Sequence, residues 1–331
     1  MYRLLADIFN DTSMVLDCLS PAFPKPFRVL LLSFSSCLRA LCGVCAGSAK
    51  ASLSAHFAKR GNLGELNAKD SSQETVISLL GMLAGSMVVS WVTSPMATWA
   101  TLIALLSVHL GTNYQAVRAV QMTSLNRQRA NILFGELLEN DRAKVLSPRE
   151  VSEQERVFEK NGVLRCGGEV LGHCRIGVSM EMLLGRINVS RRTQTGAFDA
   201  LSVKLPDLVG VFANEGYILW HSENSARELR TDEVLIVLKK DCTAEDQLKA
   251  WMHALMTVQL RAKYEVKTTI SQSDEKHSKP QLDQLRVMLQ RTNQVWKQYA
   301  PVLRNKGWDL DIAALETRAG VRAVIYRKKD S

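Results

Sequence analysis

The sequence lacks the marks of several common protein classes. Its first residues include Asp7, Asp11 and Asp17, so they form neither the basic n-region nor the uninterrupted apolar region of a signal peptide. They are also too acidic for a typical transit peptide. The seven cysteines are an odd number, which argues against a complete disulfide framework. Most of them lie in apolar surroundings, which suit reduced and buried thiols.

The sequence also has no dense block of Lys and Arg interleaved with aromatic residues. Its 42 Lys and Arg exceed its 33 Asp and Glu, and the formal net charge is +9. A basic excess of this kind can serve nucleic acid, anionic lipid or simple solvation. Because the basic residues are scattered, we rank lipid headgroups or solvation first and expect no nucleic-acid partner.

A clear metal-binding or redox motif is missing as well. Cys42 and Cys45 have C-x-x-C spacing, but in an apolar helix without a second such pair they are more often two small core residues. Cys166, His173 and Cys174 could bind a metal ion, yet no fourth ligand is evident beside them. We therefore expect neither a metal nor a cofactor.

No catalytic constellation stands out among the remaining polar residues. The glycines at 167–168 are not followed by a phosphate-binding loop. Asp7 and Asp11 stand four residues apart, as do Asp70 and Glu74, and paired carboxylates can act as acid and base. At the start of a helix, however, they more often interact with the helix dipole or with solvent. The sequence therefore leans toward a non-enzymatic protein.

What the sequence does contain is long apolar runs, concentrated between residues 62 and 134. A polar loop is predicted at 62–74, followed by the charge-free run Thr75–Val92, a turn that contains Pro95, and a second apolar run, Ala97–Val117. The first run would measure roughly 27 Å as a helix, just short of a typical hydrocarbon core. We predict a helical hairpin over 75–117 that lies in or against a membrane.

The hairpin has basic flanks and an uncharged turn. The basic residues before and after it are Lys59, Arg60, Lys69, Arg118, Arg127 and Arg129. If both helices span a membrane, this pattern places both ends in the positive-inside compartment. Ser71 and Glu74 have capping-box spacing, which predicts that the first helix begins near Ser72.

Two further helices are predicted ahead of the hairpin, at 2–19 and 27–57, with Pro21, Pro24 and Pro26 between them. Small residues recur with G-x-x-x-G spacing in the second of these helices and again in the hairpin. Those glycines are Gly43, Gly47, Gly81 and Gly85. Such spacing lets another helix approach closely, either in a membrane or in a soluble bundle.

The C-terminal part is more polar and alternates strands with helices. Strands are predicted at 217–221 and 233–239, helices at 244–260 and 281–306, and a closing β-hairpin at 309–316 and 321–328. The order β-β-α-α-β-β suggests a small α+β module with its helices on one face of an antiparallel sheet. The domain boundaries are predicted as a mainly α, membrane-associated helical bundle at 1–146, an irregular connection at 147–212, and the module at 213–331.

Several long motifs resemble the root UVB sensitive (RUS) family. They are Asn62–Thr75, His109–Val120 and Leu125–Arg129, together with Leu5–Asp11 ahead of them and the region around Gly307 near the C-terminus. The similarity is strong from about residue 4 to residue 129, patchy through 146–212 and moderate beyond. Family members carry a further N-terminal stretch before the Asp7 block, so we expect this chain to be a fragment, a variant or a truncated gene model.

The resemblance implies a membrane-associated protein. Plant members are linked to seedling UV-B and light responses, plastids, auxin transport and vitamin B6 homeostasis. The resemblance implies no established reaction. It makes a plastid location an expectation if the source is a plant or an alga. The organelle is otherwise open.

We therefore predict a helical anchor in the membrane lipid and a C-terminal module that recruits a protein partner or another RUS family member. The candidate functional surface consists of polar residues in and around the hairpin. These are Lys69, Asp70, Gln73, Glu74, His109, Asn113, Arg118 and Asn126. Capping and hydrogen bonding between helices explain the same residues about equally well.

Two alternatives stay open. The first is a small-solute carrier, in which His109 and Asn113, close to one turn apart on one face, would line a path through the membrane. The second is a regulator or enzyme that acts on a B6 vitamer, which the missing phosphate loop weakens.

Overall fold

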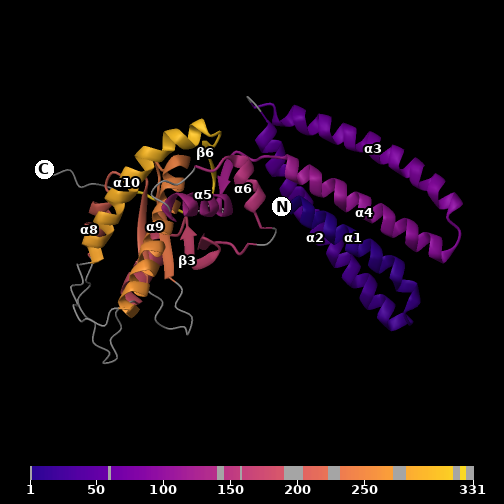
Figure 1. The fold of residues 1–331 in the computed structure, drawn as a ribbon, viewed down its shortest axis with the longest axis horizontal. Coiled ribbons are helices and arrows are strands. Elements are labelled where there is room, and N and C mark those ends of the chain that lie inside the picture. Colours follow the sequence, from indigo (N-terminus) through magenta and orange to yellow (C-terminus); the bar gives the residue numbers. More distant parts are fainter. Residues whose placement is uncertain are drawn as a thin grey trace. The chain divides into compact units, whose positions relative to one another are not determined.

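The computed structural model divides the chain into two compact units, Met1–Gln121 and Met122–Ser331 (Figure 1). We call them the helical unit and the mixed unit. The described residues are 2–58, 61–139, 145–156, 159–189, 204–222, 232–270, 281–315 and 321–325. The first compact unit ends at residue 121, ahead of the domain boundary predicted at 146, because the next helix is buried in the core of the mixed unit.

Four long helices make up most of the described part of the helical unit. Its elements are α1 (Tyr2–Leu19), the 3₁₀-helix η1 (Ser20–Ala22), α2 (Lys25–Phe57), α3 (Leu63–Trp91) and α4 (Pro95–Ala119). Prolines stand in the first turns of η1, α2 and α4, where a missing N–H leaves no hydrogen bond unmade. The two helices predicted ahead of the hairpin are thus confirmed.

Helices α1 and α2 pack side by side along their length (Figure 1). The Arg28 guanidinium donates hydrogen bonds to the carbonyls of Ser20 and Pro21, at 3.2 and 3.1 Å, and so satisfies acceptors exposed where α1 ends. The Ser35 hydroxyl donates to the Ser13 carbonyl at 3.1 Å. These bonds fix the two helices as a hairpin.

Helix α3 begins at Leu63, so the predicted start near Ser72 and the predicted polar loop at 62–74 are wrong. The segment is polar, but most of its residues are good helix formers. The Lys69 ammonium lies 2.7 Å from the Glu65 carboxylate one turn earlier, which supports the helix. The Ser72 hydroxyl donates back to the Ala68 carbonyl inside the helix.

Helices α3 and α4 are the two helices predicted for the hairpin, but their main contacts are not with each other. Helix α4 packs on α1, and α3 contacts α2. A Cβ at any of the four G-x-x-x-G glycines would meet nothing within 4 Å. The close helix packing predicted from that spacing is therefore not formed within the described part of the chain.

The mixed unit holds both strands and helices. Its elements are β1 (Ser124–Asn126), α5 (Arg127–Glu139), α6 (Pro148–Gln154), β2 (Val163–Cys166), β3 (Glu169–Ile176), α7 (Met180–Val189), α8 (Leu205–Val211), β4 (Tyr217–Ser222), β5 (Asp232–Lys239), α9 (Ala244–Ile270), α10 (Gln281–Asn305), β6 (Asp309–Ala314) and β7 (Arg322–Ala323). The predicted order of strands and helices from β4 onward is confirmed.

The sheet differs from the prediction in two ways. Its strand order is β2-β3-β5-β4, with β7 also paired to β5, and it is mixed because β3 and β7 run parallel to β5. The predicted closing hairpin is wrong, since β6 pairs with β1 and β7 with β5. Residues 147–212 are also more than an irregular connection, because β2 and β3 form one side of this sheet.

Helix α9 forms the centre of the core in the mixed unit. It packs against the strands on one side and contacts α5 and α10, so that even the polar His253 is fully buried. Its apolar face, Leu248, Trp251, Leu255 and Val258, is buried. Helix α5 buries Leu133 and Phe134 here, which explains why the helical unit ends before it.

Candidate functional site

The polar half of α3 carries four of the candidate residues. Lys50 of α2 reaches across to two of them, and its ammonium lies 2.9 Å from the Asp70 carboxylate and 2.8 Å from that of Glu74. Lys69 is paired with Glu65 within α3, and Gln73 is exposed. This group therefore joins α2 to α3 just before the apolar half of α3 begins.

Helix α4 carries three more candidates. The Nδ1 atom of His109 lies 3.0 Å from Oδ1 and 3.1 Å from Oδ2 of Asp11 on α1. Asn113 is half-buried, and the guanidinium of Arg118 stands 5.2 Å from the centre of the Tyr114 ring. The contact between His109 and Asp11 links α4 to α1 through two residues that are 98 positions apart in the sequence.

Asn126 belongs to the mixed unit and has a structural role there. Its Oδ1 accepts a hydrogen bond from the Arg129 amide at 2.9 Å, as an N-cap residue of α5 does. The eight candidates are therefore divided among a contact of α3 with α2, a contact of α4 with α1, and a helix cap. Asp11 is the partner of His109, although it is not among the candidates predicted from the sequence. The sequence feature that could have identified it is its four-residue spacing from Asp7.

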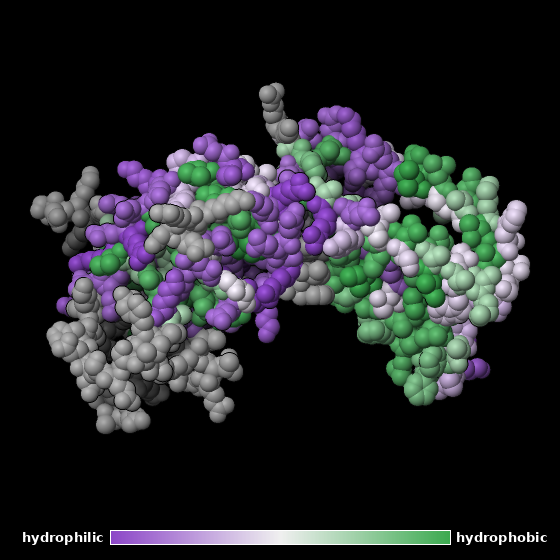
Figure 2. Space-filling model, in the orientation of Figure 1, coloured by the Kyte–Doolittle hydropathy of each residue, from purple (hydrophilic) through white to green (hydrophobic). Residues whose placement is uncertain are grey.

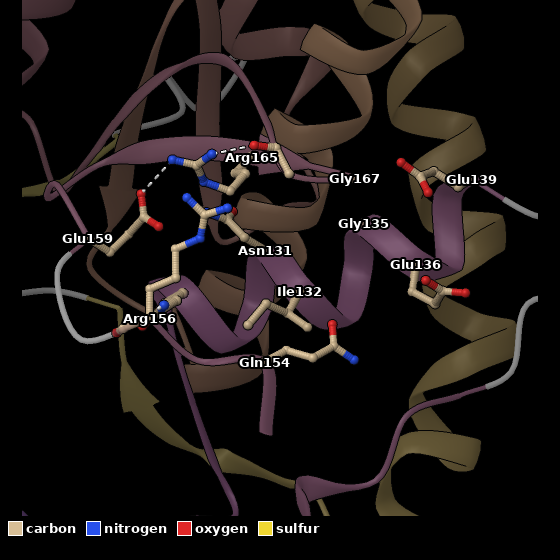
Figure 3. A pocket seen from close by; sticks show the side chains of 12 residues that line it. Asn131, Ile132, Gly135, Glu136, Glu139, Gln154, Arg156, Glu159, Arg165 and Gly167 are labelled. Carbon is tan, nitrogen blue, oxygen red and sulfur yellow. Dashed lines mark hydrogen bonds and ion pairs between the residues drawn. The ribbon is translucent and has the colours of Figure 1, made fainter. Parts of the chain in front are cut away.

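A small cavity in the mixed unit was not predicted from the sequence (Figure 3). It measures about 160 Å³. Its lining is mostly polar and comes from α5, the end of α6 and the β2–β3 turn, with Gln128, Asn131, Ile132, Gly135, Glu136, Glu139, Gln154, Arg156, Glu159, Arg165, Gly167 and Gly168 contributing. Half of it falls in the region predicted to be irregular.

Charges of both signs line this cavity. Arg156, Glu159 and Arg165 are drawn near Asn131, and Glu136 and Glu139 extend from the end of α5 (Figure 3). The Arg165 guanidinium lies 3.2 Å from the Glu159 carboxylate and also donates to the Gly168 carbonyl. Its Nε has no hydrogen-bond partner although it is buried. The cavity therefore suits a small polar molecule.

The cysteine beside this cavity is inert rather than nucleophilic. Burial, and then the hydrogen bond to Glu139, raises the pKa of the Cys166 thiol to about 12. The thiol is 3.3 Å from Oε1 of Glu139 and 3.4 Å from Nε2 of Gln259. Cys174 is buried, and burial raises its pKa further. Among the described residues, no group of three or more His, Cys, Asp or Glu side chains is placed to hold a metal ion.

Two family models match the chain. The one described as "Vitamin B6 photo-protection and homoeostasis domain" matches residues 1–141, and "Root UVB sensitive protein, C-terminal" matches residues 214–318. Together they cover most of the sequence. No solved structure matches the chain significantly.

Three curated relatives are similar to the chain. Protein root UVB sensitive 3 of Arabidopsis thaliana is 31% identical over 265 residues, which cover 80% of this chain and 56% of that protein. RUS family member 1 of Dictyostelium discoideum is 40% identical over 160 residues, or 47% of this chain and 30% of that protein. Protein root UVB sensitive 2, chloroplastic, of Arabidopsis thaliana is 26% identical over 254 residues, or 76% and 52%. The chain thus spans at most 56% of these relatives.

Proposed function

Because the chain belongs to the root UVB sensitive family, we propose that it is a membrane-anchored, non-enzymatic member of that family that serves vitamin B6 homeostasis. The helical unit would be the anchor, and the mixed unit would recruit a protein partner or another family member. One observation carries the anchor: the apolar side chains of α2, α3 and α4 face outward.

The outward-facing surface is extensive. No residue of α3 or α4 is buried, and the large hydrophobic side chains from Val76 to Trp91 are 40–88% exposed. Figure 2 shows hydrophobic residues gathered over the helical unit. Half-burying a side chain of this size contributes about 1 kcal/mol, so moving α3 alone out of water is worth on the order of 10 kcal/mol. Soluble monomers rarely leave such a surface in water.

The lengths of these helices also fit a membrane anchor. Helices α2, α3 and α4 are each long and apolar enough to cross a membrane. The charge-free part of α3 rises over about 26 Å, against a hydrocarbon thickness of about 30 Å. Its polar first half would then lie at the headgroups, where Lys50, Asp70 and Glu74 meet.

The three charged residues of α2 that follow its first turn have polar partners, as a nonpolar setting requires. Arg28 binds the carbonyls at the end of α1, Arg39 pairs with Asp17, and Lys50 pairs with two carboxylates of α3. In water such exposed pairs contribute little to stability. At a membrane surface they let charged residues lie within otherwise apolar helices, which supports the anchor.

Carbonate extraction of the full chain, expressed in cells, tests the anchor. We expect the protein to stay in the membrane pellet at high pH and to enter solution only with detergent. Protease added to sealed vesicles should leave a protected fragment that includes α3 and α4. Release into the carbonate wash without detergent would refute the anchor. A pull-down with the full chain solubilised in detergent then tests recruitment, with the membrane fraction of the source cells as prey.

The link to B6 homeostasis can be tested at the cavity of the mixed unit. A guanidinium fork suits phosphate, and both Arg156 and Arg165 line this cavity (Figure 3). We expect pyridoxal phosphate to bind in an absorbance titration and Arg165→Gln to weaken that binding. Arg149→Gln is the matched control, since Arg149 is an exposed arginine of α6 that does not line the cavity. Equal binding by both variants would remove the cavity from the proposal.

A second candidate is the small-solute carrier, which the contact between His109 and Asp11 favours. A polar pair among apolar helices is a common feature of paths for ions and solutes. In vesicles that contain the purified chain, solute flux lost on Asn113→Leu would support the carrier. An absence of flux with B6 vitamers would count against it and leave the anchor.

A further inference from the structure

We propose that Asp7, Asp11 and His109 form a proton-binding site inside the helical unit, at the contact between α1 and α4. The site is independent of the membrane anchor, because helices of this chain bury both aspartates without any lipid. It also differs from the solute path of a carrier, since its ligand is a single proton.

The two aspartates stand one turn apart on α1, and both are buried. Asp7 is 7% exposed and Asp11 is 8% exposed. Asp11 has His109 of α4 as its partner, with Nδ1 at 3.0 and 3.1 Å from the two carboxylate oxygens. A hydrogen bond at this place requires a proton on Nδ1 or on the carboxyl group.

Asp7 and Asp11 each have one buried oxygen without a hydrogen-bond partner, Oδ2 and Oδ1 respectively, and Asp11 also lies 3.0 Å from Nδ1 of His109. The cation nearest to Asp7, Nε of Arg3, lies 4.0 Å from its Oδ1 on a side chain that is half exposed. A buried, ionised carboxylate with a free oxygen is costly, and a bound proton removes that cost. Asp7 is therefore the natural position for the proton.

The charges that surround the site support one proton. On α1 the facing charges are Arg3, Asp7 and Asp11, which sum to −1. Helix α2 contributes Cys42, a neutral thiol within electrostatic range of Asp7. Farther along α1, Asp17 is paired with Arg39 of α2, and that pair adds no net charge. One proton thus brings the site to neutrality.

Electrostatics at Asp7 point the same way. Burial raises the pKa of Asp7 above its ordinary value, the Asp11 charge adds to the rise, and Arg3 and His109 oppose it. A group whose pKa is raised on folding stabilises the fold most at low pH, and that stabilisation is lost as the pH rises through the folded-state pKa. Protonation of Asp7 should therefore stabilise the packing of α1.

The site is also placed to affect α4. No residue of α4 is buried, so apolar contacts hold it only weakly on α1. The contact between Asp11 and His109 is the polar link between the two helices. Protonation of Asp7 one turn away removes its repulsion of Asp11, and it also removes the attraction of Asp7 to His109. The proton on Asp7 therefore changes the charge at this link.

The test uses the full chain in detergent micelles, followed by infrared spectroscopy across a pH series. We expect the band of a protonated carboxyl group to persist well above the ordinary Asp pKa of about 3.9. The band should disappear in Asp7→Asn and persist in Asp17→Asn, the matched control on the same helix. Absence of the band in the wild type, or its persistence in Asp7→Asn, would overturn the proposal.

Thermal unfolding of the same samples gives a second readout. The midpoint of the wild type should fall as the pH rises above the ordinary Asp pKa of about 3.9 and Asp7 loses its proton. Asp7→Asn should lose this dependence and unfold at a higher temperature than the wild type at the alkaline end. An unchanged pH dependence in that variant would contradict the site. If Asp7→Asn fails to fold, wild-type protein labelled with ¹³C at Asp carboxyls must show one carboxyl that titrates late.

These results are separable from those on the anchor. A chain that enters the carbonate wash but keeps the late-titrating carboxyl loses the anchor and retains the proton site. A chain that stays in the membrane without such a carboxyl does the reverse.

Discussion

The sharpest test of the anchor is a single charge placed in the middle of α3. Leu83 stands at the centre of the charge-free stretch Thr75–Trp91, and its side chain is 57% exposed. In water, Leu83→Lys would replace one exposed side chain by another and change the free energy of unfolding by no more than about 0.5 kcal/mol. In a bilayer the same substitution places an ammonium group near the midplane.

The cost of that substitution follows from insertion scales. Leucine at the centre of a spanning helix contributes about −0.5 kcal/mol and lysine about +3 kcal/mol, a difference of about 3.5 kcal/mol. Since each 1.4 kcal/mol is a factor of ten, the insertion equilibrium of α3 should shift by about 300-fold. Leu63→Lys is the matched control, because Leu63 lies in the polar first half of α3 and is 42% exposed.

The assay is synthesis of the full chain in the presence of membrane vesicles, followed by protease treatment and carbonate washing. We expect the protected fragment that contains α3 to be lost in Leu83→Lys and retained in Leu63→Lys. Helices α2 and α4 would still hold the chain in the membrane, so the fragment pattern is the readout rather than total binding. Equal protection of the two variants, or no protected fragment in the wild type, would refute the reasoning.

Three further predictions concern the mixed unit. Gly167 has φ +54°, and a Cβ there would lie 2.5 Å from Oε1 of Glu139. Gly167→Ala should therefore lower the free energy of unfolding, measured by urea titration, by about 1–3 kcal/mol. Adding Glu139→Ala to that variant should restore part of the loss. Cys166, with a pKa of about 12, should resist iodoacetamide at pH 8 in the native protein and react after denaturation, and equal rates would contradict its burial. Burial, and then Lys249, lowers the pKa of His253 to about 3, so the stability of the mixed unit should fall by about 1.4 kcal/mol per pH unit between about pH 6.5 and pH 3, and His253→Asn should reduce this slope.

Much of the secondary structure followed from local patterns. The helices predicted at 2–19 and 27–57 and the elements from Tyr217 to Ala314 appear within a few residues of their expected bounds, apart from the longer α9. Periodicity of apolar residues and helix-breaking prolines operate over a few residues, so they can be recognised in sequence. The polar start of α3 was missed because its composition indicated a loop while its helix propensity decided the outcome.

Pairing between distant segments was beyond the reach of those patterns. The parallel pairing of β3 with β5, and of β1 with β6, joins strands separated by many residues, and nothing in either strand alone specifies its partner. The same holds for the sites. Spacing alone drew attention to His109 and to the Asp7–Asp11 pair, but only packing of α4 on α1 brings His109 to Asp11.

The sequence by itself determined the helices α1 and α2, the elements from β4 to β6, the charge-free length of α3 and the family to which the chain belongs. Each of these depends on residues close together in the chain or on long matching motifs. The tertiary structure decided which charges meet, which glycines face open space and which cysteines are buried. Those properties depend on contacts between residues far apart in sequence. Lys50 shows the difference: it is an ordinary basic residue in the chain, yet in the fold it binds two carboxylates of α3.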